Sequence, residues 1–299
     1  MILTLSYTSS ADARSCWRKY YFHNILGLNL KKKTSALGVG TVIHECFEKY
    51  FLKSPPQDIL NHIDASYQKM RTMENDPIEL ERLYLDHITC KAMWQNYPLN
   101  DLGFVDVQPE QSFKIAFLGR GNYLSGRVDG LVRLQDKWWI REVKTTSLSR
   151  AQFEGRAETS YQATGYVYGL MKARGIEVSG ILFDVIKRPK IRKRTTENAE
   201  EFGKRLAAEY TIPEKTNFYY YRHYSYRSGH QVNEYLKDVY ALVKEVRTHT
   251  HRGQWWRNPD ACWTFGSACP YKRICWMDDL DEDVLSAYYD RRVHASRDS

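Results

Sequence analysis

The fold is decided by "YLSGRVDGLVRL" at residues 123–134, followed by "KWWIREVKT" at 137–145. Both stretches are rich in β-branched and aromatic residues, which favour strands. Asp136 and Lys137 make a tight connection between them, so the two stretches predict a hairpin. "SFKIAFLG" at 112–119 predicts a further strand directly before the pair.

Acidic and basic residues lie close together on these predicted strands. Glu142 and Lys144 are two apart, so their side chains share one face, and Asp129 on the adjoining strand is expected beside that face. Two carboxylates and an amine suit phosphodiester hydrolysis. The carboxylates would hold Mg²⁺ or Mn²⁺, which polarises the phosphate and acidifies a water, while the lysine positions or deprotonates that water. Alternatively, an isolated Glu-x-Lys is an ordinary exposed ion pair.

Helices are predicted on both sides of this sheet. The first begins near Ser9 or Ser10 as N-cap, and Pro77 separates two helices within 58–96. The segment 31–35 reads as a loop. The remaining helices are predicted at 38–51, 158–174, 198–210 and 229–252, with two more strands at 179–188 and 217–226.

The pattern predicts one α/β domain over residues 1–299, with a small mixed sheet flanked by helices. We expect a helical N-terminal part at 1–100, the core sheet and helix at 101–225, and a C-terminal helix with a cysteine-rich cap at 226–299. Hydrophobic residues make up 42% of the chain, enough for a sizeable core. No apolar run reaches eighteen residues and the N-terminus is too polar for a signal peptide, so we expect a cytoplasmic protein of a bacterial or phage-infected cell.

The charge balance favours a polyanionic partner. The net charge is +8 and the isoelectric point about 9.0. Basic proteins bind nucleic acids through phosphate contacts and counterion release, although many basic proteins bind none. Aromatic residues, at 14%, could stack on unpaired bases or simply fill the core.

Asp129 followed by the triplet Glu142–Val143–Lys144 resembles the PD-(D/E)XK signature of RecB-type nucleases. The resemblance continues upstream in "GTVIHE", which contains His44, and downstream in "YQATGY" at 161–166. It implies a restriction-endonuclease-like core and a metal held by His44, Asp129, Glu142 and the backbone carbonyl of Val143. Valine replaces the proline of the motif's name before Asp129.

Two further positions take their expected roles from the same resemblance. Gln162 and Tyr166 are four apart and so lie on one helix face. The resemblance implies that they help to orient Lys144 and the DNA. Glu110, ahead of the strand that carries Asp129, is similar to a further acidic position of these nucleases.

Six cysteines are present, and structural disulfides are improbable in a cytosolic protein. Cys16 together with Cys262, Cys269 and Cys275 resembles the [4Fe–4S] staple of AddB-type nucleases, in which the cluster ties the chain ends together. Four thiolates also suit Zn²⁺, and ordinary buried thiols are a further alternative. The gap before Cys269 is longer than the usual two residues. Cys46 and Cys90 lie in apolar helices and are expected in the core.

The densest basic run follows the strand at 179–188 and could reach a DNA backbone or form a solvated flap. It comprises Lys187, Arg188, Lys190, Arg192, Lys193 and Arg194.

These features predict a Mg²⁺- or Mn²⁺-dependent deoxyribonuclease, more an exonuclease than an endonuclease, acting on DNA ends or single strands. Recombination, repair and phage or CRISPR DNA processing are the expected settings, with recombination or CRISPR-adaptation proteins as partners. No G-x-x-x-x-G-K-[ST] loop of a motor is present. The alternatives are a non-catalytic DNA-binding scaffold that keeps the fold and cluster, and a zinc-stapled structural protein.

Overall fold

The computed structural model describes residues 2–31, 38–99, 103–119, 121–264 and 267–292. The chain forms two compact units, each discontinuous in sequence. We call residues 34–114 and 126–229 the sheet unit, and residues 1–33, 115–125 and 230–299 the terminal unit. These boundaries cut across the predicted ranges 1–100, 101–225 and 226–299, because residues 1–33 group with the C-terminal segment. Apart from Lys31, the predicted loop at 31–35 falls among residues outside the described ranges.

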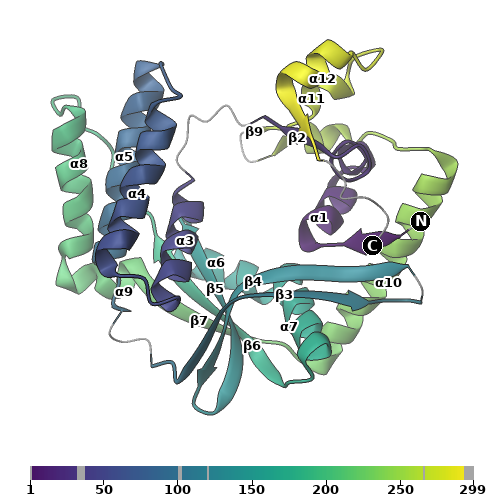
Figure 1. Ribbon diagram of the computed structural model, residues 1–299, viewed down its shortest axis with the longest axis horizontal. Coiled ribbons are helices and arrows are strands. Elements are labelled where there is room, and N and C mark those ends of the chain that lie inside the picture. Colours follow the sequence, from purple (N-terminus) through teal and green to yellow (C-terminus); the bar gives the residue numbers. More distant parts are fainter. Residues whose placement is uncertain (1, 32–37, 100–102, 120, 265–266, 293–299) are drawn as a thin grey trace. The chain divides into compact units, whose positions relative to one another are not determined.

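A mixed sheet forms the centre of the sheet unit (Figure 1), which confirms the predicted α/β class. β4 pairs antiparallel with β5, β5 parallel with β6, and β6 antiparallel with β7, while β3 also pairs with β4 and β1 pairs parallel with the first residues of β4. The strands are β3 (Asp106–Ala116), β4 (Asn122–Leu134), β5 (Lys137–Thr146), β6 (Val178–Lys187) and β7 (Tyr220–Tyr226).

The hairpin between β4 and β5 forms as predicted, one residue earlier than expected. Its two central residues are Gln135 and Asp136, with φ of 49° and 59°, and Leu134 pairs with Lys137. Positive φ at both central residues matches the twist of a two-residue hairpin. The connection therefore sets the register of β4 against β5.

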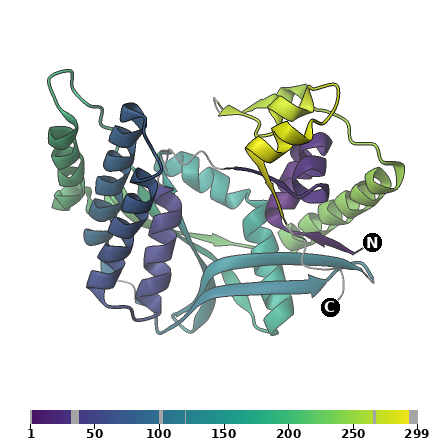
Figure 2. The same ribbon diagram turned by 45° about the horizontal axis from the view of Figure 1, so that its top comes forward.

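Helices α3, α4, α5 and α8 pack together beside this sheet. In Figures 1 and 2, α4 and α5 lie side by side, and α8 packs against α5. Proline takes the first position of both α4 and α5, where a missing N–H leaves no hydrogen bond unmade. The bounds are α3 (Val39–Phe51), α4 (Pro56–Arg71), α5 (Pro77–Gln95) and α8 (Ala199–Ala208).

The predicted helix at 158–174 is wrong at its start, because two helices occupy this region. α6 (Arg150–Glu158) begins at a capping box formed by Ser149 and Gln152, a signal that was present in the sequence. α7 (Tyr161–Arg174) has its own cap at Ser160 and ends at Gly175 in the left-handed conformation. Beyond α8, the short helix α9 (Thr216–Tyr219) precedes β7, so the predicted strand at 217–226 begins late.

The terminal unit joins the two ends of the described chain. The first helix begins earlier than predicted, with Ser6 as N-cap. After residue 276, α12 leads into β10, which pairs antiparallel with β2. Among the described helices, including the long α10, none is long and apolar enough to cross a membrane. The elements are β1 (Leu3–Leu5), α1 (Tyr7–Ser15), α2 (Trp17–Tyr20), the π-helix η1 (Tyr21–Ile25), β2 (Leu28–Leu30), α10 (Gly229–Arg252), β8 (Trp263–Thr264), β9 (Ser267–Ala268), α11 (Lys272–Cys275), α12 (Glu282–Tyr288) and β10 (Tyr289–Arg291).

Candidate active site

The β4–β5 ladder ends beside the predicted site. Its last backbone pair joins Gly130 to Arg141. Asp129 directly precedes Gly130 on β4, and its Oδ2 accepts a hydrogen bond from the Val143 backbone N–H at 2.8 Å. A side chain thus takes the place that a backbone acceptor holds along a regular ladder. This end of the ladder is where the chemistry-bearing side chains collect.

Four of the predicted residues meet there. His44 Nδ1, on α3, lies 3.1 Å from Asp129 Oδ1. On β5, Lys144 Nζ donates to Glu142 Oε1 at 2.7 Å. The Glu142 side chain is only 6% exposed, and its Oε2 has no hydrogen-bond partner. Helix α3, β4 and β5 therefore bring together side chains that are almost a hundred residues apart in the sequence.

The surroundings shift the pKa values of the Glu142 and Asp129 carboxyl groups in opposite directions. Burial raises the pKa of Glu142, the nearby charge of Asp129 adds to this rise, and Lys144 opposes it. Burial also acts on Asp129, but the hydrogen bond from His44 and that from the Val143 N–H outweigh it and lower its pKa. Neighbouring carboxyl groups whose pKa values are shifted in opposite directions are common at reactive sites.

The donor types at this point fit Mg²⁺ or Mn²⁺. Two carboxylates and an imidazole are suitable ligands, and the unpartnered Glu142 Oε2 is the kind of buried atom that a cation would satisfy. As placed, however, no group of three or more His, Cys, Asp or Glu side chains in the described part of the chain is arranged to hold a metal ion. Asp129 is occupied by His44 and Val143, and Glu142 by Lys144, so an ion would compete with these contacts.

Gln162 and Tyr166 lie on α7, near the opposite face of β5 from α3. Val143 belongs to the core that α3 covers, so Glu142, the adjacent residue, points the other way. The Gln162 amide donates to the Tyr166 hydroxyl at 2.9 Å. Burial and the charge of Glu142 raise the pKa of Tyr166 to about 12. Tyr166 is therefore a neutral hydroxyl close to the carboxylates at neutral pH.

A cavity of about 640 Å³ opens beside His44 and Asp129. Glu110 and Arg127 also line it, and their side chains approach to 3.6 Å. Arg127 was not predicted as a site residue, although its position two residues before Asp129 on β4 places both on one face. Glu45 and Glu48 of α3 were also overlooked. The cavity is lined by Gly40, Thr41, His44, Glu45, Phe47, Glu48, Glu110, Arg127 and Asp129.

A buried ion pair underlies the site. Arg141 donates from Nε and Nη2 to Asp184 Oδ2 of β6, at 3.0 and 2.8 Å. Its guanidinium carbon lies 4.2 Å from the centre of the Phe47 ring of α3. The Arg141 side chain, which is 1% exposed, thus joins the helix that carries His44 to the strand that carries Glu142. In the sequence, Arg141 is only a charged residue within a predicted strand. Nothing in the sequence indicates Asp184 as its partner.

The four predicted cluster cysteines all belong to the terminal unit. The Asn258 backbone N–H lies 3.3 Å from Cys16 Sγ, and the Cys269 N–H donates to the Cys262 carbonyl. Burial raises the pKa of both Cys269 and Cys275, and the neighbouring Cys16 adds to each rise. All are free thiols, and their role as cluster ligands stays a prediction. Cys46 and Cys90 are fully buried, as expected.

The basic run is only partly available to a ligand. Lys187 is buried, with Nζ 3.6 Å from the centre of the Phe218 ring. Arg188 pairs with Asp86 and Lys193 with Glu81, each at 2.6 Å. Three others are exposed, and they remain candidates for DNA contacts: Lys190, Arg192 and Arg194.

Comparison with known proteins gives one family match. A family model described as the PD-(D/E)XK nuclease superfamily matches residues 4–276. No curated protein matches the chain significantly. Among solved structures, the chain is similar to one described as "Crystal structure of SSO0001", with 13% identity over 65% of this chain and 83% of that chain. The TM-score of 0.23 is too low for this likeness to bear on function.

Proposed function

Because this chain belongs to the PD-(D/E)XK nuclease superfamily, we propose that it is a divalent-metal-dependent deoxyribonuclease centred on Asp129, Glu142 and Lys144. The observation that carries this proposal is the meeting of these side chains with His44 where the β4–β5 ladder ends. The buried Glu142 Oε2, which has no partner, supports the view that a cation completes the site.

The residues divide the work between them. His44, Asp129, Glu142 and the Val143 carbonyl would hold Mg²⁺ or Mn²⁺, which supplies Lewis-acid polarisation of the phosphate when bound. Lys144 orients or deprotonates the attacking water and balances the charge that develops on the phosphate.

Gln162 and Tyr166 of α7 act beside these residues. Tyr166 is protonated at neutral pH, as any tyrosine is, and its raised pKa keeps it protonated at higher pH, so it can act as a hydrogen-bond donor. Gln162 donates to the Tyr166 hydroxyl, and in this proposal the pair helps to orient Lys144 and the DNA.

The test compares two lysines of one strand. Lys144→Ala is expected to slow cleavage of end-labelled DNA in Mn²⁺ by about 10²- to 10⁴-fold, the range for loss of a general acid or base. Lys137→Ala, at the exposed start of β5, removes the same charge and is expected to leave the rate unchanged. Wild-type protein that leaves DNA intact with several divalent metals would contradict the proposal. Binding without cutting would instead support a non-catalytic scaffold.

We further propose an exonuclease acting on DNA ends or single strands, in recombination, repair, or phage or CRISPR DNA processing. The resemblance to RecB-type nucleases and the net charge of +8 support this choice. A time course on linear and circular single-stranded DNA tests it. Degradation of the linear form alone is expected, and equal cleavage of the circle would identify an endonuclease.

For Cys16, Cys262, Cys269 and Cys275 we propose a structural [4Fe–4S] cluster, with Zn²⁺ as the lesser alternative. Their membership of one unit supports this, as does the position of Asn258 between Cys16 and Cys262: its N–H faces the Cys16 sulfur, and its carbonyl lies 3.9 Å from Cys262 Sγ. Iron and sulfide analysis of protein purified without oxygen distinguishes the two. Zinc without iron would remove the iron–sulfur assignment.

A further inference from the structure

Helix α3 lies along one face of β5, and contacts toward its two ends hold it there. A Cβ built at Gly40, in the first turn of α3, would lie 3.1 Å from Thr145 Oγ1. Toward the other end of the helix, the Arg141 guanidinium carbon lies 4.2 Å from the centre of the Phe47 ring. His44 lies between these two contacts along α3. A shift of the helix at either contact therefore moves the imidazole.

The Arg141 contact belongs to a ring of four buried side chains. Arg141 donates twice to Asp184 Oδ2, and the Tyr97 hydroxyl donates to Asp184 Oδ1. The Tyr97 ring then meets the Phe47 ring edge-on, with the ring centres 4.8 Å apart. Each member thus touches two others, and none is more than 6% exposed. We call Phe47, Tyr97, Arg141 and Asp184 the Arg141 network.

The chemistry of this network favours a role in orientation over one in stability. A buried ion pair adds little net stability, because the loss of hydration offsets the attraction between the charges. A guanidinium is planar, donates from a rigid fork and stacks on aromatic rings, so it fixes the groups that it contacts. Phe47 carries this constraint to the active site, since it lines the same cavity as His44 and Asp129.

We propose that the Arg141 network positions the metal site: by fixing α3 against β5, it keeps the His44 imidazole within reach of an ion held by the two carboxylates. Ligands have to stand within about 0.5 Å of their productive geometry, and roughly one helical turn separates His44 from Phe47. No member of the network touches the ion in this proposal, so all four are positioning residues. The inference rests on the proposed metal-dependent function.

The test measures Mn²⁺ binding to the full chain without DNA, from the electron paramagnetic resonance signal of the free ion. Tyr97→Phe removes only the hydroxyl that bonds Asp184, and it is expected to raise the Mn²⁺ dissociation constant about 10-fold, the lower end of the range for loss of an outer-shell partner. Phe47→Leu removes the ring beside Arg141 and should have a similar effect. Mn²⁺ that the Glu142→Gln protein no longer binds belongs to this site.

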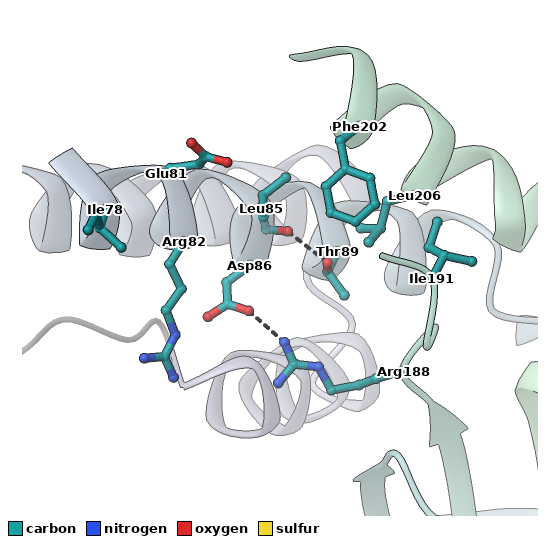
Figure 3. Close-up of a pocket in the computed structure, with 10 residues that line it drawn as sticks. All are labelled: Ile78, Glu81, Arg82, Leu85, Asp86, Thr89, Arg188, Ile191, Phe202 and Leu206. Atoms are coloured by element: carbon teal, nitrogen blue, oxygen red, sulfur yellow. Dashed lines mark hydrogen bonds and ion pairs between the residues drawn. The ribbon is translucent and has the colours of Figure 1, made fainter. Parts of the chain in front are cut away.

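Two matched controls separate positioning from stability. Tyr220→Phe removes a hydroxyl that donates to the Met93 carbonyl at 3.1 Å in the same core. Phe202→Leu removes a buried ring that also has an arginine, Arg205, 5.1 Å from its centre. Phe202 is on α8 and lines a separate cavity of about 430 Å³ beside α5 (Figure 3). Both controls should lower the melting temperature but leave Mn²⁺ binding unchanged.

Unchanged Mn²⁺ binding in either Tyr97→Phe or Phe47→Leu would overturn the inference. An equal loss of binding in the two controls would do so as well, because any buried side chain of the unit would then act in the same way. Wild-type protein that binds no Mn²⁺ is a third contradicting outcome. The nuclease proposal fails separately, when wild-type protein binds Mn²⁺ but leaves DNA intact. In that case weaker binding in the two network variants would still establish the positioning role.

Discussion

Asp129 Oδ2 lies 2.8 Å from the backbone nitrogen of Val143, on the strand that carries Glu142 and Lys144. The carboxylate therefore does two things: it holds β4 against β5 past the end of their ladder, and it presents its other oxygen to His44. Substitutions can separate these roles.

Asp129→Asn should remove activity while preserving the fold. The asparagine carbonyl oxygen can still accept from the Val143 N–H, but the ligand charge is lost. Cleavage should fall by more than the roughly 10- to 100-fold that loss of an outer-shell partner of a metal causes. The melting temperature should change little. Asp129→Ala, which loses both roles, should lower both activity and melting temperature, and equal melting temperatures for the two variants would contradict this division.

Breaking the buried ion pair should destabilise the protein strongly. Arg141→Met leaves the Asp184 charge buried without its cation, which costs about 3–5 kcal/mol. The double variant Arg141→Met with Asp184→Leu removes that charge and should recover part of the loss in urea unfolding. Lys204→Met, which breaks an exposed pair with Glu200, is the control and should have little effect. A double variant less stable than Arg141→Met would show that the uncompensated charge is not the cause.

Two helical glycines should respond oppositely to alanine. A Cβ at Gly169 of α7 would lie 2.2 Å from the Phe113 ring, so Gly169→Ala should destabilise by about 1–3 kcal/mol through overpacking. No heavy atom lies within 4 Å of a Cβ built at Gly155 of α6. Gly155→Ala should stabilise by about 0.5–1 kcal/mol because alanine is the better helix former. Thermal unfolding measures both changes, and a destabilised Gly155→Ala would indicate a contact at that face.

Cys275→Ala should abolish the brown colour expected of an iron–sulfur protein, remove the iron, and lower the melting temperature. The reason is that one thiolate of the proposed cluster is lost. Cys90→Ala is the control. It also removes a buried thiol and should lower the melting temperature, but iron should remain. Unchanged iron content in Cys275→Ala would remove this residue from the cluster.

Acid should weaken the terminal unit through Asp12. The buried Asp12 carboxylate contacts Lys19 at 2.9 Å and His23 at 2.5 Å. Burial alone would raise its pKa, but the hydrogen bonds from His23 and Lys19 outweigh burial and lower the pKa below its ordinary value of 3.8. A lowered folded-state pKa contributes stability that is fully present above pH 3.8 and lost as the pH falls through the lower folded value.

Melting temperatures at a series of pH values check this expectation. Between pH 6 and pH 4 the difference between wild type and Asp12→Asn should be constant, and below pH 3.8 it should shrink. A difference that grows on acidification would contradict the sign.

The parts of the fold that local patterns encode were predictable. The alternation of "IREVKT" placed Glu142 and Lys144 on one face, and α3 and α10 form where helical spacing indicated. α6 was missed because its apolar pattern is weak, although Ser149 and Gln152 signalled its start. The partners of the basic run could not be predicted, since Asp86 and Glu81 lie about a hundred residues from Arg188 and Lys193.

From the sequence alone follow the chemical groups that are present, their order along the chain, and the direction of neighbouring side chains on one strand, because strand geometry repeats every two residues. Packing alone made the β4–β5 ladder end at Gly130, next to Asp129, and brought Arg141 to Asp184. Separation along a chain carries no distance between side chains until packing brings the elements together.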